Sequence, residues 1–186
     1  NNQGRILNIL GKHHEKNARH LQADGHEANA KQATDQAQEC YTQALSYFRD
    51  AESILKSLPE EGGVNLGACY QNMADTQLAL GQLEDAEQTY RHALKILGKA
   101  LGKEEPFVIL CLSRLAHVTN RLDKNAEAEI FYQHALKYMS ENVGGDERQL
   151  IELLTDMSAF YEKIGNEEKA VSCRAGATLI QERQDK

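Results

Sequence analysis

The sequence predicts an all-α protein built from about four antiparallel helix pairs. Three observations predict this class. The composition is rich in Ala, Gln, Glu and Leu, and the 186 residues include only two prolines, which favours helices over strands. Alanines recur at an interval of 42 residues. Apolar residues within the intervals follow the i, i+3, i+4, i+7 spacing of amphipathic helices.

Two series of alanines define the repeat. The series are Ala44, Ala86, Ala128, Ala170 and Ala51, Ala93, Ala135, Ala177. Each alanine of the first series pairs with the alanine seven residues later in the second series. The residue between the two is aromatic in the first three pairs, at Phe48, Tyr90 and Tyr132, and is Arg174 in the last. A further small residue lies 12 positions before the first alanine of each of the last three alanine pairs, at Ala74, Ala116 and Ser158. Small residues let antiparallel helices approach closely, so each 42-residue repeat predicts one helix pair.

The last three pairs are predicted over residues 64–103, 106–143 and 148–184. Gly81 and Gly165 follow the first helix of their pairs. A glycine there can adopt the left-handed conformation that ends a helix. Pro59 and Pro106 fall between pairs, where a proline interrupts no helix.

The first pair, over residues 1–60, departs from this pattern. Residues 25–38 contain no large apolar side chain. The best match for a first helix is Leu7–Gly11, and Gly11 precedes Ala44 by 33 residues instead of 12. The surplus corresponds to about six helical turns.

We therefore predict a long hairpin at the N-terminus. Its helices would span residues 3–23 and 28–57, with a turn at Asp24-Gly25. The alternative is a partly disordered loop over residues 22–35. The hairpin would be either a binding arm or a spacer.

The segment from Gly81 to Ala86, followed by Tyr90 and Ala93, resembles a tetratricopeptide repeat (TPR). The 42-residue interval and the linker Leu101–Pro106 resemble the longer repeats of kinesin light chains. The resemblance covers roughly residues 64–182. It implies a right-handed superhelical stack, a TPR-like solenoid, which we expect to form a single domain over residues 1–186.

Charge and motifs exclude several functions. The 21 Lys and Arg against 28 Asp and Glu give a net charge of −7, unfavourable for non-specific binding of nucleic acid or anionic membranes. No apolar run approaches the ~20 residues that span a bilayer. No catalytic motif is present. We therefore expect no enzyme activity and no membrane insertion.

Cysteine and histidine patterns give no sign of a metal site. The clustered histidines are His13, His14, His20 and His26, and the cysteines are Cys40, Cys69, Cys111 and Cys173. Neither set has zinc-ligand spacing, so we predict no metal and no cofactor. The cysteines instead favour a reducing intracellular compartment such as the cytoplasm. The chain starts at Asn1 instead of Met, and we expect it to be a piece of a longer protein.

The TPR resemblance implies a binding surface on the first helix of each pair, which lines the inside of the superhelix. Carried over position by position, the candidate peptide-binding residues are Arg5, Asn8, Lys12, Gln71, Asn72, Asp75, Arg114, His117, Asn120, Arg121 and Lys163. Asn72 occupies the place where many TPR proteins bond a ligand's backbone. The cations favour an acidic peptide or a C-terminal carboxylate. The alternative is that these residues are solvated or pair with Asp75 and Asp156.

The chaperone-binding TPR proteins provide a more specific comparison. Asn72 and Arg114 match two positions of their carboxylate clamp. Asn8 and Lys12 have suitable residue types in swapped places, and Leu110 replaces a basic residue. The clamp is therefore incomplete.

Two functions remain open. The leading one is a protein-interaction module in which a partner peptide binds the concave groove, acting as an adaptor or scaffold for cargo or complex assembly. The alternative is self-association, as in a homodimer, through the long N-terminal hairpin or an uncapped C-terminal edge. The apolar residues expected at that edge are Leu154, Met157, Val171, Leu179 and Ile180.

Overall fold

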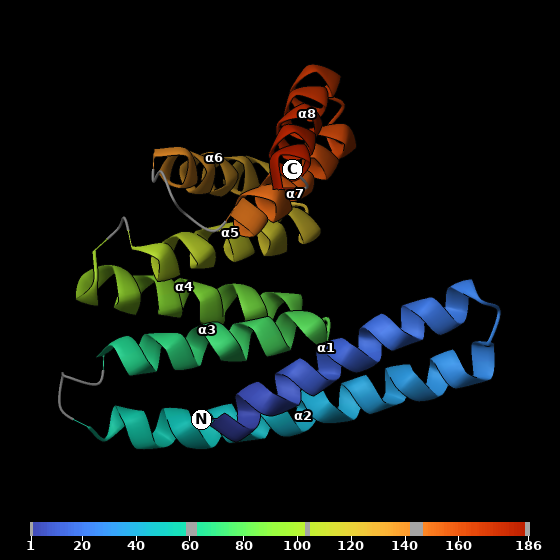
Figure 1. Cartoon of the computed structure of the whole chain (residues 1–186). Coiled ribbons are helices and arrows are strands. Elements are labelled where there is room, and N and C mark those ends of the chain that lie inside the picture. Colours follow the sequence, from blue (N-terminus) through green and yellow to red (C-terminus); the bar gives the residue numbers. More distant parts are fainter. Residues whose placement is uncertain (1, 59–62, 103–104, 142–146, 185–186) are drawn as a thin grey trace. The chain divides into compact units, whose positions relative to one another are not determined.

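The computed structural model describes residues 2–58, 63–102, 105–141 and 147–184. This part of the chain forms eight α-helices and no strand (Figure 1). The helices are α1 (Asn2–Ala23), α2 (Glu27–Lys56), α3 (Gly63–Ala79), α4 (Leu83–Ala100), α5 (Pro106–Arg121), α6 (Asn125–Glu141), α7 (Glu147–Lys163) and α8 (Glu167–Gln184). Each odd-numbered helix packs against the helix that follows it. The predicted all-α class and its helix pairs are confirmed.

The helices group into two compact units. Unit 1 comprises Asn1–Ala100 and unit 2 comprises Leu101–Lys186. Each unit contains two helix pairs. The single domain expected over residues 1–186 stays a prediction.

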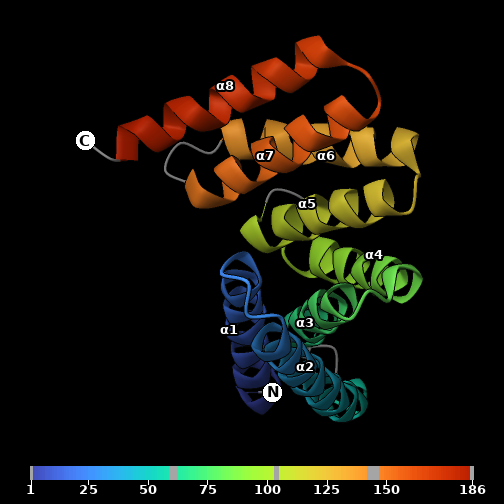
Figure 2. The same cartoon turned by 90° about the vertical axis from the view of Figure 1, so that its right-hand side faces the viewer.

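The first pair is a long hairpin, as predicted. Helices α1 and α2 contain 22 and 30 residues and lie side by side (Figure 2). Gly25 has a φ of +78°, and the His26 amide donates to the Leu21 carbonyl at 2.8 Å. This arrangement is a glycine-terminated helix end. Residues 27–35 are helical, so the loop alternative over residues 22–35 is wrong.

Glycines allow α1 to lie directly against the aromatic rings of α2. A Cβ atom at Gly11 would lie 2.6 Å from Cε1 of Tyr41, and one at Gly4 would lie 2.9 Å from Cε1 of Phe48. No side chain fits in that space, which explains why a glycine ends the Leu7–Gly11 string. The contact leaves the larger apolar residues Ile6, Ile9 and Leu10 exposed on α1.

The core of unit 1 connects α1, α2 and α3. Its buried residues are Ala44, Leu45, Phe48, Cys69 and Met73, with Leu7, Ala51, Leu55 and Leu80 packed around them. The Cys69 thiol donates to the Phe48 carbonyl at 3.4 Å. The repeat alanines Ala44, Ala86 and Ala93 are fully buried, as expected for residues that bring helices together.

Unit 2 follows the same packing pattern with different side chains. The rings of Tyr132 and Phe160 lie with their centroids 5.4 Å apart. Ser158 replaces the repeat's small alanine and donates to the Ala170 carbonyl at 3.0 Å. Gly165 has a φ of +76°, whereas Asp123 adopts +58° at the corresponding helix end of the third pair. Asp is one of the few residues besides glycine that tolerate this conformation.

A polar cluster joins three helices of unit 2. Glu129 of α6 accepts hydrogen bonds from Nζ of Lys169 at 2.8 Å and from Oη of Tyr161 at 3.2 Å. The Lys169 ammonium also lies 5.0 Å from the centroid of the Tyr161 ring. The hydrogen bond from Lys169 lowers the pKa of Glu129, partly offset by burial of the carboxyl.

The lowered pKa predicts a pH-dependent contribution to stability. A carboxyl whose pKa is lower in the folded state stabilises the fold above its unfolded pKa, about 4.3 for Glu, and this stabilisation disappears as pH falls through the folded pKa. Glu129→Gln is therefore expected to lower the free energy of unfolding at pH 7 more than at pH 3. Urea unfolding at both pH values measures this difference.

Glu182→Gln is the control for the Glu129 prediction. Glu182 is exposed on α8 and makes no ion pair within the described residues. Its substitution should alter the free energy of unfolding equally little at both pH values. A Glu129→Gln effect that does not change with pH would contradict the prediction.

Candidate functional site

The candidate residues of unit 1 lie on α1 and α3. Asn8 is buried, and its Oδ1 accepts a hydrogen bond from Oγ1 of Thr76 at 3.0 Å. Asn8 therefore ties α1 to α3 and is not free for a ligand. Arg5 and Lys12 are exposed on α1 and make no ion pair with a described residue.

The α3 candidates also take part in the fold. Gln71 is buried. The side-chain amide of Asn72 donates to the Ala68 carbonyl at 2.8 Å in its own helix. Asp75 accepts a hydrogen bond from the Tyr90 hydroxyl of α4. Asn72 is half-buried, and its Oδ1 has no partner among the described residues, so it retains an acceptor for a ligand's backbone.

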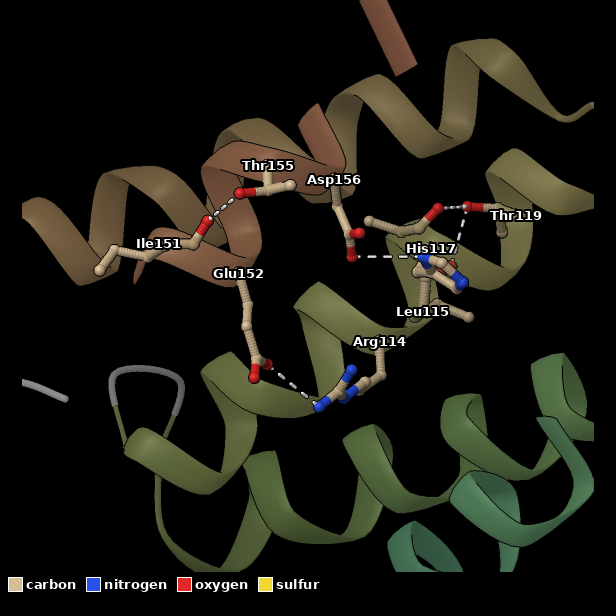
Figure 3. Close-up of polar contacts among 9 residues, drawn as sticks. Arg114, Leu115, His117, Thr119, Ile151, Glu152, Thr155 and Asp156 are labelled. Atoms are coloured by element: carbon tan, nitrogen blue, oxygen red, sulfur yellow. Dashed lines mark hydrogen bonds and ion pairs between the residues drawn. The ribbon is translucent and has the colours of Figure 1, made fainter. Parts of the chain in front are cut away.

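The candidates of unit 2 form a line of contacts between α5 and α7. Nη2 of Arg114 lies 3.4 Å from Oε2 of Glu152, and Nδ1 of His117 lies 3.2 Å from Oδ2 of Asp156 (Figure 3). These pairs come from side chains of the two helices that point toward one another. We call the set Arg114, His117, Asn120, Glu152, Asp156 and Lys163 the α5–α7 polar row.

Lys163 completes one end of this row. Its Nζ donates to the carbonyl of Asn120 at 2.7 Å and to Oδ1 of Asn120 at 3.1 Å. The same ammonium lies 2.7 Å from Oδ1 of Asp123. Arg121 is exposed beside the row and makes no ion pair with a described residue.

The structure changes the expected charge of this surface. The sequence predicts a basic binding face, but the cations Arg114 and Lys163 have the acidic neighbours Glu152 and Asp123. His117 pairs with Asp156. This pairing agrees with the alternative interpretation of the sequence, in which candidate residues pair with Asp75 and Asp156. The role of the candidate residues in peptide binding stays a prediction.

Sequence reasoning places Glu152 on the inner face of the fourth repeat but does not pair it with Arg114, and it does not find Asp123, which lies in a turn. Glu152 stands 38 residues from Arg114, close to one repeat interval. The signal that could have found it is this interval, since residues about 42 apart occupy similar places on successive first helices.

The predicted apolar edge is only partly present. Leu154 and Met157 are buried, so the expectation that they are exposed is wrong. They face the interior because α7 packs against both α6 and α8. Val171 and Leu179 of α8 are exposed, Leu179 by 67%, and Ile180 is half-buried. Self-association stays a prediction.

The described ranges lack the features of a metal site and of a membrane-spanning helix. There, no group of three or more His, Cys, Asp and Glu residues could hold a metal ion. No helix of that part is long and apolar enough to cross a membrane. None of the four cysteines, all of which are described, forms a disulfide. Burial raises the pKa of the Cys69 thiol to about 11.

Comparisons with known proteins agree with this architecture. Residues 33–99 match the model of the tetratricopeptide repeat family. The nearly identical TPR-like repeats of a Podosopora anserina protein named as a kinesin light chain have a similar structure, with a TM-score of 0.60 and 18% identity over 92% of this chain and 75% of that chain. A variant of those repeats gives a TM-score of 0.61 and 17% identity over 98% and 77%.

BtubC (BKLC) from P. vanneervenii is also similar, with a TM-score of 0.50 and 18% identity over 99% of this chain and 91% of that chain. At these identities the likeness concerns the fold. No curated protein sequence matches the chain. Residues 33–99 therefore resemble tetratricopeptide repeats in sequence, and the described helices share the fold of the TPR-like repeats of the Podosopora anserina protein.

Proposed function

We propose that this protein is an interaction module that binds an acidic segment or C-terminal carboxylate of a partner protein at the α5–α7 polar row. It would act as an adaptor or scaffold, without catalysis of its own, in a reducing compartment such as the cytoplasm. The TPR fold supports a role in protein–protein interaction generally. The particular surface and ligand are supported by the contacts of Arg114.

The observation that carries this proposal is the exposed ion pair between Arg114 and Glu152. The Arg114 side chain is 33% exposed and the Glu152 side chain is 64% exposed. A carboxylate therefore already lies opposite the guanidinium at the surface. Exposed ion pairs contribute only about 0–1 kcal/mol, so a ligand carboxylate can replace Glu152 at little cost.

The neighbouring residues suit a peptide ligand. A guanidinium can donate two parallel hydrogen bonds to one carboxylate. The Asn120 amide oxygen already accepts a hydrogen bond from Lys163, so its Nδ2 is the group that can donate to a peptide carbonyl. Arg121 adds an exposed positive charge beside the row.

Selection from a peptide-display library, followed by calorimetry on the selected peptides, tests the proposal. We expect enrichment of acidic or C-terminal carboxylate peptides with micromolar dissociation constants. Arg114→Gln should raise the dissociation constant about tenfold or more, since hydrogen bonds to charged groups contribute about 1.5–3 kcal/mol. Circular dichroism should show unchanged helicity.

The matched control is Arg174→Gln. Arg174 lies on α8, its side chain is more exposed than that of Arg114, and it too pairs with a glutamate, Glu162. This substitution removes the same charge from the same unit but away from the row, so affinity should not change. Peptides that bind wild type and Arg114→Gln equally well would overturn the proposal.

A further inference from the structure

A pocket in unit 1 is not used by the proposed function. It lies between α2, α3 and α4 and has a volume of about 340 Å³, at the small end of the range for ligand sites. Its lining includes Glu52 from α2, Tyr70, Met73 and Gln77 from α3, and Asp85 and His92 from α4. Three helices therefore contribute chemically different groups to one cavity.

Gln77 is the unusual member of this lining. The residue is only 6% exposed, yet its Oε1 has no hydrogen-bond partner among the described residues. Buried polar atoms are nearly always paired, because an unpaired one costs about 1–3 kcal/mol. Gln77 lines the pocket, so a rotation of its side chain would present this unpaired acceptor to a hydrogen-bond donor of a ligand.

Helix geometry brings Asp85 to the same end of the pocket. The rings of Tyr70 and His92 lie with centroids 5.8 Å apart, which fixes the register of the antiparallel helices α3 and α4. Seven residues further along α3 is Gln77, and seven residues back along α4 is Asp85. Equal rise per residue places these two residues level with each other. No described residue forms an ion pair with Asp85.

At the other end of the pocket, the negative charge of Glu52 is already balanced by neighbouring groups. Glu52 accepts hydrogen bonds from Oη of Tyr70 at 2.7 Å and from Nζ of Lys56 at 2.6 Å. Burial raises the pKa of Glu52, but these two donors outweigh it and hold the pKa below its usual value. The negative charge left without a counter-ion in the pocket is therefore that of Asp85. The Tyr70 ring and the Met73 thioether provide apolar wall between the two ends.

We propose that this pocket binds the side chain of an arginine presented by a partner protein. The guanidinium donates to Oε1 of Gln77 and to the carboxylate of Asp85, while the methylene groups pack on Tyr70 and Met73. Arginine fits better than lysine because its planar group carries five donors in a fixed fork and is less strongly hydrated. This pocket lies on other helices and in another unit than the α5–α7 polar row, and its ligand has the opposite charge. An experiment can therefore disprove one proposal without affecting the other.

The test is an NMR titration of the isotope-labelled full chain. The probe is acetyl-arginine amide, and the control ligand is acetyl-citrulline amide, which has nearly the same shape but no charge. We expect saturable shifts for the pocket residues, including the side-chain amide of Gln77, with the arginine probe. Citrulline should bind at least about tenfold more weakly, as expected for loss of a charged hydrogen bond.

Two neighbouring acidic residues provide matched variants. Asp85 and Glu84 both lie in the first turn of α4, but only Asp85 lines the pocket. Asp85→Asn should weaken binding of the arginine probe about tenfold, whereas Glu84→Gln should leave it unchanged. The two substitutions remove one charge each from the same helix end, so effects on the helix dipole are similar.

Gln77→Met provides a second, independent readout. Methionine has a similar shape but lacks the amide, so probe binding should weaken while the free energy of unfolding stays equal or rises, because the unpaired acceptor is gone. The proposal is overturned if the arginine probe produces no saturable shift in the pocket. Equal shifts with citrulline, or equal effects of Asp85→Asn and Glu84→Gln, would also overturn it.

Discussion

Replacing Phe48 by alanine is expected to lower the free energy of unfolding of unit 1 by about 3–5 kcal/mol. Phe48 is fully buried in the cluster that joins α2 to α3, and its ring lies against Gly4 of α1. Alanine would remove the contacts of the ring and leave a cavity between three helices. Since small domains have a total stability of about 5–15 kcal/mol, this loss is a large fraction.

The adjacent Tyr47→Ala is the control for Phe48→Ala. Tyr47 is an aromatic residue of the same helix, but it is 42% exposed. Its removal should cost about 1 kcal/mol or less, because surface substitutions usually have small effects. Urea unfolding followed by circular dichroism measures both variants. Similar losses for the two would mean that Phe48 does not hold α1, α2 and α3 together.

Replacing Gly67 by alanine is expected to destabilise unit 1 by about 1–3 kcal/mol. A Cβ atom at Gly67 would lie 2.6 Å from Cγ and Cδ2 of Leu97, and Leu97 is fully buried. The leucine cannot move aside, so α3 and α4 must separate. This strain outweighs the roughly 0.5–1 kcal/mol that alanine normally adds to the stability of a helix.

Gly98→Ala should have the opposite sign. Gly98 lies in α4, next to Leu97, and apart from its chain neighbours and the backbone of its own helix no described atom lies within 4 Å of a Cβ built there. Alanine should therefore stabilise the unit by about 0.5–1 kcal/mol through its helix preference and a less flexible unfolded chain. Thermal and urea unfolding of the two variants give the comparison. An increase in stability for both would show that α3 and α4 are not in close contact at Gly67.

Much of the backbone arrangement could be predicted from residue spacing. The 42-residue alanine series marks the helix contacts, and the 33-residue separation of Gly11 from Ala44 predicts the long hairpin that α1 and α2 form. Gly81 and Gly165 adopt the expected left-handed conformation. These features depend on local geometry, the helical period and the special freedom of glycine, which the order of residues determines directly.

The polar surfaces could not be predicted in the same way. Arg114 pairs with Glu152, 38 residues away, and Lys163 with Asn120, 43 residues away. Such contacts depend on rotations and shifts of neighbouring helices by a few ångströms, because hydrogen bonds form only over a narrow range of distance and angle. Repeat spacing places these residues on facing helices but does not say which of them meet.

Gln77 is the clearest example of a feature that depends on tertiary packing and not on residue spacing. In the sequence it is an unremarkable polar residue of a helix. Only the packing of α2, α3 and α4 buries its amide and leaves Oε1 without a partner in the described structure, level with Asp85. The sequence by itself determined the helix pairs, since their signals are periodic and local. The tertiary structure alone decided which charges are neutralised and where a buried acceptor stays open, since both depend on how separate helices are placed against each other.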